Sequence, residues 1–241
     1  MNSLLMANSL VDGFVLSSFI GRGIVIAQII GSVIMVAAIC GKLRELGFVS
    51  RSLRRFTRDF STSHDVLEYY FERRPTIVSG VERIYKDTCE RLLKLITPDP
   101  RAALTGDAGA RPTVLSKLEI ELVNGTCEHA LTEEETSVEH GMTVIATVVA
   151  LSPMLGLLGT VWGVLDAFAE MGSAGSASLA TIAPSISSAL VTTVVGLLIA
   201  IPGVVAFNKM NSDIRGIQND MEGFADELTG RIACEFQGKG V

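Results

Sequence analysis

Two long apolar runs joined by a short connector constrain this chain more than any other feature. The runs occupy residues 142–168 and 182–207, and the connector between them, 169–181, is rich in Gly, Ser and Ala. Residues 142–165 and 171–208 carry no charge. About 20 apolar residues cross a hydrocarbon core of about 30 Å as a helix. Each run can therefore span a membrane, and the pair predicts an antiparallel transmembrane hairpin.

A third apolar run, residues 23–41, lies near the N-terminus, with only Gln28 and Ser32 as polar interruptions. Its length is the minimum for a span. A hydrophobic fraction of 48% and a mean hydropathy of +0.42 also indicate a membrane protein. Residues 1–22 have no Lys or Arg before Arg22, so they lack the basic start of a signal peptide and are expected to form an outer amphipathic segment. We therefore predict an all-α integral membrane protein with three transmembrane helices.

The distribution of basic residues predicts the orientation. Every Lys and Arg except Arg22 falls between the first two runs or after the third. By the positive-inside rule, the N-terminus and the connector are expected outside, and the C-terminus in the cytoplasm. The first span is followed by a basic cluster, which beside a membrane is expected to meet anionic headgroups rather than nucleic acid. The cluster comprises Lys42, Arg44, Arg51, Arg54, Arg55 and Arg58.

The segments 42–141 and 208–241 are expected to be cytoplasmic and helical. Apolar periodicity predicts that the first span continues as a helix and that residues 66–70 and 78–96 are helical. Residues 97–113 form a linker, after which a helix from Val114 leads into the second span as a long stalk, with Glu133, Glu134 and Glu135 on a solvated face. The third span continues with a stripe expected to pack on other cytoplasmic helices or a neighbouring subunit: Ile214, Ile217, Met221, Phe224, Leu228 and Arg231.

Small and hydroxyl residues distinguish the second and third spans from simple anchors. Ser188, Thr192 and Gly196 are four apart and share one side of a helix. Gly159 and Gly163 form a GxxxG pattern, which lets helix backbones approach closely in lipid. Such a face packs against protein or lines a wet path. The residues predicted for helix packing are Gly156, Gly159, Gly163, Gly196, Pro153 and Pro202.

Thr160 and Thr193 lie at similar depth, roughly 12 and 16 Å from the outer ends of their helices. Two interpretations are open for them. Each hydroxyl can bond back to its own helix and do nothing further, or the pair can line a proton path. Asp166 and Glu170, four apart at the outer end of the second span, are likewise either interfacial acids facing water or groups that concentrate cations at a pore entrance.

The blocks LGLLGTVWGVLDAF and IAPSISSALVTTVVGLLIAIPGVVAFN resemble the signature of the MotA/TolQ/ExbB proton-channel family, closest to its three-span ExbB/TolQ branch. The resemblance covers residues 145–209 and implies a stator subunit of the bacterial inner membrane. It implies a pentameric ring around two copies of a single-span ExbD/TolR-like partner, with a TonB/TolA-like protein as a further partner. It also implies protons as the coupling ion and Thr160 and Thr193 as pore-lining residues. Ser188 stands where the best-known members carry glutamate, and Asp166 where they usually carry a neutral residue.

No enzyme is expected, because the sequence contains no P-loop, HExxH or Gly-x-Ser-x-Gly motif and no paired carboxylates within a span. We expect no catalytic residue, no metal site and no cofactor beyond the coupling proton. The leading hypothesis is a proton-driven subunit whose partner supplies a membrane Asp. The alternative is a passive scaffold that organises partner helices without ion flux. The process energised stays open among nutrient uptake, outer-membrane maintenance and motility, although three spans disfavour motility.

Overall fold

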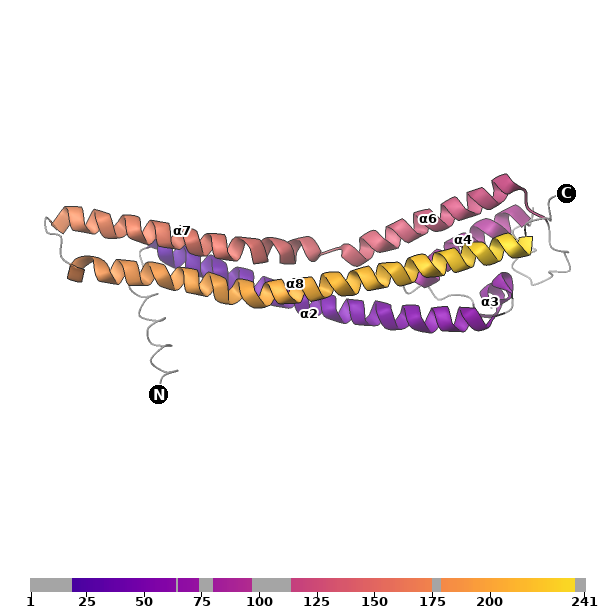
Figure 1. Cartoon of the computed structure of the whole chain (residues 1–241), viewed down its shortest axis with the longest axis horizontal. Helices are drawn as coiled ribbons and strands as arrows, with labels where there is room; N and C mark the ends of the chain where they lie inside the picture. The colour runs from indigo at the N-terminus through magenta and orange to yellow at the C-terminus, as the bar shows by residue number, and fades with distance from the viewer. Residues whose placement is uncertain (1–18, 64, 74–79, 97–113, 175–178, 237–241) are drawn as a thin grey trace. The chain divides into compact units, whose positions relative to one another are not determined.

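A computed structural model describes residues 19–63, 65–73, 80–96, 114–174 and 179–236. Helices account for the regular structure of these residues, as the all-α prediction requires (Figure 1). The predicted linker 97–113, and the predicted outer segment up to residue 18, lie outside the described residues. The helices are α2 (Phe19–Thr62), α3 (Val66–Arg73), α4 (Val81–Ile96), α6 (Lys117–Glu139), α7 (Met142–Ala174) and α8 (Leu179–Phe236).

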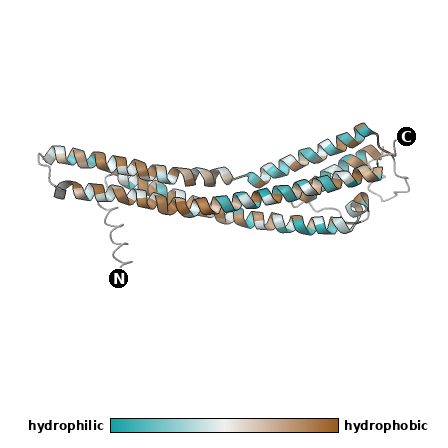
Figure 2. Ribbon diagram, in the orientation of Figure 1, coloured by the Kyte–Doolittle hydropathy of each residue, from teal (hydrophilic) through white to brown (hydrophobic). Residues whose placement is uncertain are grey.

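Among the described residues, three stretches of helix are long and apolar enough to cross a membrane, as the prediction of three spans requires. They lie in α2, in the stretch Lys117–Ser173 that contains α6 and α7, and in α8 from Ile182. Figure 2 shows the change in composition along these helices: α7 and the first half of α8 are largely brown, whereas α6 and the last half of α8 alternate between brown and teal.

The helices that contain the first and third spans continue beyond the membrane as predicted, but the helix before the second span does not. The first span continues as helix to Thr62, and the third continues to Phe236. The predicted stalk before the second span is instead interrupted at His140 and Gly141. Gly141 adopts a φ of 85°, which favours glycine because other residues are strained there. Most of the predicted connector 169–181 is also helical, because α7 runs to Ala174 and α8 begins at Leu179.

The chain divides into two compact units, and α2 and α8 contribute to both. The first, called here the apolar unit, comprises residues 1–43 and 141–210. The second, called the polar unit, comprises residues 44–140 and 211–241. The candidate site lies in the apolar unit.

An aromatic cluster forms the core of the polar unit. Phe56 and Phe60 from α2 meet Tyr85 from α4 and Phe224 from α8, with ring centroids 5.2 to 5.6 Å apart and edge-to-face geometry. Tyr69 from α3 completes the cluster, and the Tyr85 hydroxyl donates a hydrogen bond to the Val66 carbonyl. The stripe predicted on α8 supplies this core: Ile214, Ile217, Met221, Phe224 and Leu228 are all buried.

Polar side chains cap two helix ends in the polar unit by hydrogen bonds to backbone groups. Ser116 and Glu119 form a reciprocal capping box at the start of α6. At the end of α2, Arg231 donates to the carbonyls of Phe60 and Ser63 and lies over the Phe60 ring, 4.6 Å from its centroid. Such a cation satisfies carbonyls that the last helical turn leaves open.

Glu134 corrects the prediction of a solvated acidic face. Its side chain is buried and accepts hydrogen bonds from the Gly80 backbone N–H at 2.9 Å and from Arg83 at 3.3 Å. Glu133 remains half-exposed and pairs with Arg83. A buried carboxylate requires such partners, since leaving it alone in an apolar core is costly.

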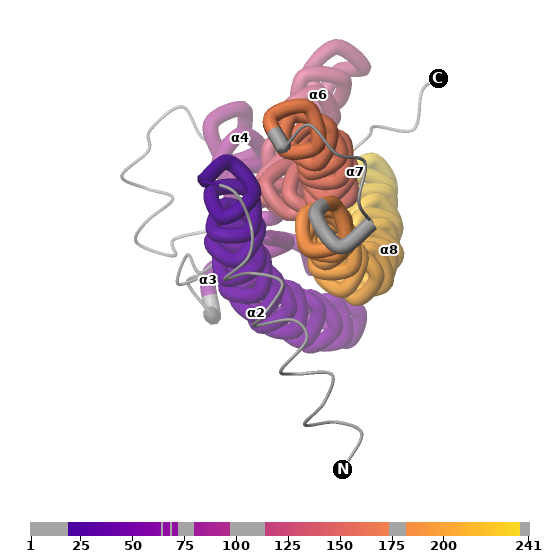
Figure 3. Tube along the Cα trace, turned by 90° about the vertical axis from the view of Figure 1, so that its left-hand side faces the viewer, coloured from indigo at the N-terminus to yellow at the C-terminus, as the bar shows by residue number. Residues whose placement is uncertain are grey.

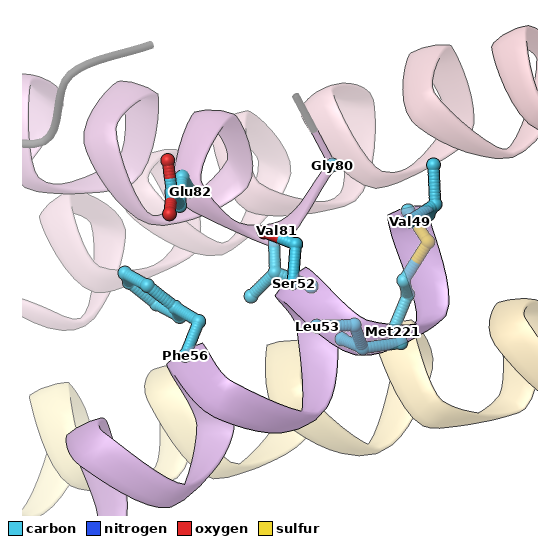
Figure 4. Close-up of a pocket in the computed structure, with 8 residues that line it drawn as sticks. All are labelled: Val49, Ser52, Leu53, Phe56, Gly80, Val81, Glu82 and Met221. Carbon is cyan, nitrogen blue, oxygen red and sulfur yellow. The ribbon is translucent and has the colours of Figure 1, made fainter. Parts of the chain in front are cut away.

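A small hollow lies between α2, α4 and α8 in the polar unit (Figure 4). Leu53, Phe56, Val81 and Met221 line it, and the volume open to a water-sized molecule is about 0 Å³. The hollow is therefore a packing imperfection.

Candidate functional site

Glycines bring α7 and α8 into direct backbone contact in the apolar unit. A β-carbon placed on Gly159 would lie 2.2 Å from the Thr192 hydroxyl oxygen, and one placed on Gly163 would lie 2.4 Å from the Ala189 β-carbon. Neither distance leaves room for a side chain. The GxxxG pattern thus faces α8 and packs directly against the side chains of Thr192 and Ala189. Figure 3 shows the ends of α2, α7 and α8 as three separate tubes.

The same kind of contact continues along α8. A β-carbon on Gly196 would lie 2.5 Å from the Ser152 carbonyl oxygen, and one on Gly156 would lie 2.9 Å from the Thr193 α-carbon. Pro153 lies half-buried inside α7, and Pro202 lies exposed inside α8. Each proline removes one backbone N–H from its helix.

Hydroxyl groups link the two helices at this contact. Thr193 on α8 donates to the Gly156 carbonyl of α7 at 2.9 Å. The buried Thr192 donates to the Ala189 carbonyl at 2.7 Å and reaches the same Gly156 oxygen at 3.3 Å. Ser188, one turn earlier, is also buried. Two side chains of α8 therefore converge on one carbonyl of α7.

The two threonines that the sequence paired behave differently. Thr160 is half-buried and donates to the Leu157 carbonyl of its own helix at 2.7 Å. Thr193 instead bonds across to the neighbouring helix. The hydroxyl of Thr160 therefore bonds within its own helix, whereas the hydroxyl of Thr193 takes part in an interhelical network.

Gln28 is a member of this network that the sequence analysis did not assign. Its side chain comes from α2, is 1% exposed, and donates through Nε2 to the carbonyls of Ser152 and Thr192, each at 3.2 Å. Its Oε1 is buried and has no hydrogen-bond partner among the described residues. The one signal in the sequence is a lone amide within 19 uncharged residues.

Two carboxylates lie near the end of the hairpin at which α7 ends. Asp166 is half-buried, and its Oδ2 is buried with no hydrogen-bond partner among the described residues. Glu170, one turn further along α7, is exposed and accepts a hydrogen bond from the Ser185 hydroxyl of α8 at 2.7 Å. Asp166 and Glu170 are therefore the first charged side chains after the uncharged residues 142–165 of α7.

The predicted basic cluster is exposed at five of its six positions. The exposed members, all on α2, are Arg44, Arg51, Arg54, Arg55 and Arg58. Lys42 is only 5% exposed and lies inside the apolar unit, so its ammonium does not share their exposure.

The four cysteines, Cys40, Cys89, Cys127 and Cys234, are free thiols. Cys89 and Cys127 are buried in the polar unit, and burial raises the pKa of each thiol. A thiol with a raised pKa is a poor nucleophile. These two residues therefore act as small apolar side chains of the core.

The outer surfaces of the three spans are apolar and uncovered within one chain. Only 22% to 28% of the most apolar window in each span is buried. The residues left exposed include Ile29, Val33, Leu157, Val161, Leu190, Val194 and Leu198. These surfaces require lipid or other protein to cover them.

Comparisons with known proteins agree with this architecture. The model of the MotA/TolQ/ExbB proton channel family matches residues 100–223. A biopolymer transport protein ExbB of Xanthomonas campestris is 43% identical over 112 residues, which is 45% of this chain and 44% of the relative. A Tol-Pal system protein TolQ of Haemophilus influenzae is 39% identical over 110 residues, 46% of this chain and 48% of the relative.

A TolQ of Pseudomonas aeruginosa is similar over a longer stretch. It is 32% identical over 183 residues, which cover 74% of this chain and 72% of that protein. The chain thus spans about half the length of the first two relatives and nearly three quarters of the third.

Proposed function

The chain belongs to the MotA/TolQ/ExbB proton channel family, and on this premise we propose that it is the multi-span subunit of an inner-membrane, proton-driven motor. The motor would use the proton motive force to energise transport or cell-envelope work. Relatives named for biopolymer transport and for the Tol-Pal system support this class of function.

The observation that carries the proposal is a hydroxyl network between α7 and α8, at a depth where the hairpin has no charged side chain. Residues 23–41, 142–165 and 171–208 contain no Asp, Glu, Lys, Arg or His. Threonine and serine hydroxyls can donate and accept hydrogen bonds along a proton route, but they do not ionise near neutral pH. A proton that crosses at this depth therefore needs a titrating group from another protein.

We assign that group to a single-span partner of the ExbD/TolR type, which presents an Asp to the wall formed by Thr160 and Thr193. Ser188 and Thr192, which are buried within the chain, are assigned to helix packing behind this wall. Protonation makes the Asp neutral, so that it can pass the wall, and release on the cytoplasmic side restores its charge. The drive is about 2.3 kcal/mol per charge per 100 mV, in addition to the pH gradient. Asp166 and Glu170 would concentrate cations at the outer mouth.

The assembly we propose is a homopentamer around two partner helices. It explains why so little of each apolar window is buried within one chain. The remaining surface would divide between neighbouring subunits and lipid, with the N-terminus outside and the C-terminus in the cytoplasm. A TonB/TolA-like protein would receive the motion of the partner.

Proton flux in proteoliposomes tests the proposal. The chain is reconstituted with its single-span partner, and flux is followed with an entrapped pH-sensitive dye. Thr193→Val is expected to lower flux at least about tenfold, roughly 1.4 kcal/mol in the barrier, because it removes the hydroxyl at nearly constant shape. Thr193→Ser keeps a hydroxyl and is expected to retain flux. Thr147→Val is the matched control, since Thr147 is exposed on α7 and bonds only to its own helix in the structure.

A passive scaffold is the competing function. It predicts that Thr160→Val and Thr193→Val leave partner-driven work intact, and this result would refute the proton-route assignment. Flux through the chain reconstituted without its partner would instead indicate a self-sufficient pore.

A further inference from the structure

The amide of Gln28 lies where all three helices of the apolar unit meet. It reaches from α2 to a carbonyl of α7 and a carbonyl of α8, at Ser152 and Thr192. These hydrogen bonds join residues 124 and 164 positions apart in the chain. In this part of the structure, one side chain therefore bonds to both arms of the hairpin.

The carbonyl that Gln28 holds on α8 belongs to the peptide group between Thr192 and Thr193. A peptide group is planar, so fixing its oxygen also fixes the nitrogen and the α-carbon of Thr193. That α-carbon lies directly against Gly156, and the Thr193 hydroxyl donates to the Gly156 carbonyl. The peptide group that accepts from Gln28 is therefore the one that carries Thr193 into its contact with Gly156.

The arrangement is a poor one for stability alone. Oε1 of Gln28 is buried without a partner among the described residues, and an unsatisfied buried acceptor destabilises a fold. The carbonyls of Ser152 and Thr192 lie within helices, where a backbone N–H can already serve each of them. An apolar side chain of similar size would fill the same space without the unsatisfied oxygen.

We propose that Gln28 is a positioning residue of the proton route, which sets α8 against α7 and so aims the Thr193 hydroxyl. This inference rests on the proposed function. If Gln28 served only packing, its loss would lower the stability of the assembled protein and the proton flux together. For a positioning residue, the proton flux per assembled complex falls while the stability does not.

The test measures both quantities in the full complex with its single-span partner. Gln28→Met keeps the shape and removes both donors. It is expected to lower flux per assembled complex about tenfold while the Tm stays equal or rises. Gln28→Glu keeps one donor while its carboxyl is protonated. Its flux is therefore expected to lie between that of the wild type and that of Gln28→Met, and to rise as the pH falls. Ser32→Ala, one turn further along α2, is the control and is expected to match the wild type.

Each other outcome has a definite meaning. Normal flux per complex in Gln28→Met overturns the inference and leaves the proposed function standing. A loss of Tm or assembly that accounts for the whole loss of flux makes Gln28 purely structural and also overturns it. Absence of flux in the wild-type complex refutes the proposed function, and this inference falls with it.

Discussion

Helices pack together through small residues in the apolar unit and through large aromatic residues in the polar unit. In the apolar unit, Gly156 and Gly196 let the backbones of α7 and α8 lie in contact. In the polar unit, Phe60 and Tyr85 fill the space between helices with rings. The difference follows from the solvent. Water drives large apolar side chains together, whereas lipid tails solvate them as well as protein does, so close van der Waals contact and interhelical hydrogen bonds have to hold helices together.

The comparison has a functional consequence. Small residues leave backbone carbonyls and short hydroxyls at the surface where α7 meets α8, as Thr193 and Gly156 show. A wall of such groups can offer hydrogen bonds to a passing polar group. The phenylalanine rings of the polar unit, such as Phe60 and Phe224, offer none, and the hollow beside Phe56 has no room for water. The unit with the smaller side chains is therefore the one to which we assign the proposed proton route.

Truncation of the aromatic core should have the largest effect. Phe60 is fully buried and contacts Tyr69, Tyr85 and Phe224. Phe60→Ala is expected to lower the free energy of unfolding by about 3–5 kcal/mol, because it removes a large buried side chain and leaves a cavity. Denaturant-induced unfolding of the full chain in detergent measures this change.

Phe48→Ala is the matched control for this truncation, since Phe48 lies on the same helix and is 56% exposed. Its effect is expected to stay within about 0.5 kcal/mol, as is usual for surface substitutions. Equal losses from the two variants would show that the aromatic cluster does not dominate the polar unit.

Addition of one methyl group tests the apolar unit in the opposite sense. Gly159→Ala places a β-carbon 2.2 Å from the Thr192 hydroxyl oxygen, so α7 and α8 must separate. The expected loss is about 1–3 kcal/mol, the usual cost of overpacking. Gly172→Ala on the same helix meets nothing within 4 Å and is expected to be neutral or stabilising by up to ~1 kcal/mol. Unfolding by graded SDS in mixed micelles compares the two, and a Gly159→Ala protein as stable as the wild type would mean that the helices pack less closely.

The spans were predictable from the sequence because their signal is local. An uncharged run of about 20 residues has few alternatives to a membrane helix, and residues 23–41 and 182–207 are such runs. The interruption at Gly141 was not predictable, since one glycine inside a helical pattern is often tolerated. Its positive φ identifies the break only once the backbone is known.

The site was only partly predictable, because its hydrogen bonds join distant residues. The small face of α8 followed from four-residue spacing. The role of Gln28 did not, since its two carbonyl partners belong to other helices and carry no side-chain signature. Glu134 was assigned to a solvated face for a similar reason: the Gly80 N–H that it binds lies 54 positions away. Buried polar groups depend on tertiary partners, which sequence periodicity does not reveal.

Acidity should distinguish the two units by a smaller effect, centred on Glu235 at the end of α8. Burial, followed by a hydrogen bond with Asp65 and the negative charge of Asp65, raises the pKa of Glu235 from 4.5 to about 7, although the Val66 N–H partly opposes this. The folded chain therefore binds the proton more tightly than the unfolded chain. The stabilisation is complete below about pH 4.5 and is lost as the pH rises to about 7.

Glu235→Gln should flatten the fall in unfolding free energy between about pH 4.5 and 7, because glutamine keeps the shape of the side chain and does not titrate. The matched control is Glu121→Gln, at an exposed position on α6, which should keep the slope of the wild type. Unfolding midpoints measured at several pH values across this range provide the comparison. The spans contain no Asp, Glu, Lys, Arg or His over residues 23–41, 142–165 and 171–208, so Gly159→Ala should shift every midpoint and leave the slope unchanged. A slope that persists in Glu235→Gln but disappears in Gly159→Ala would place the titrating group in the apolar unit and reverse the contrast between the two units.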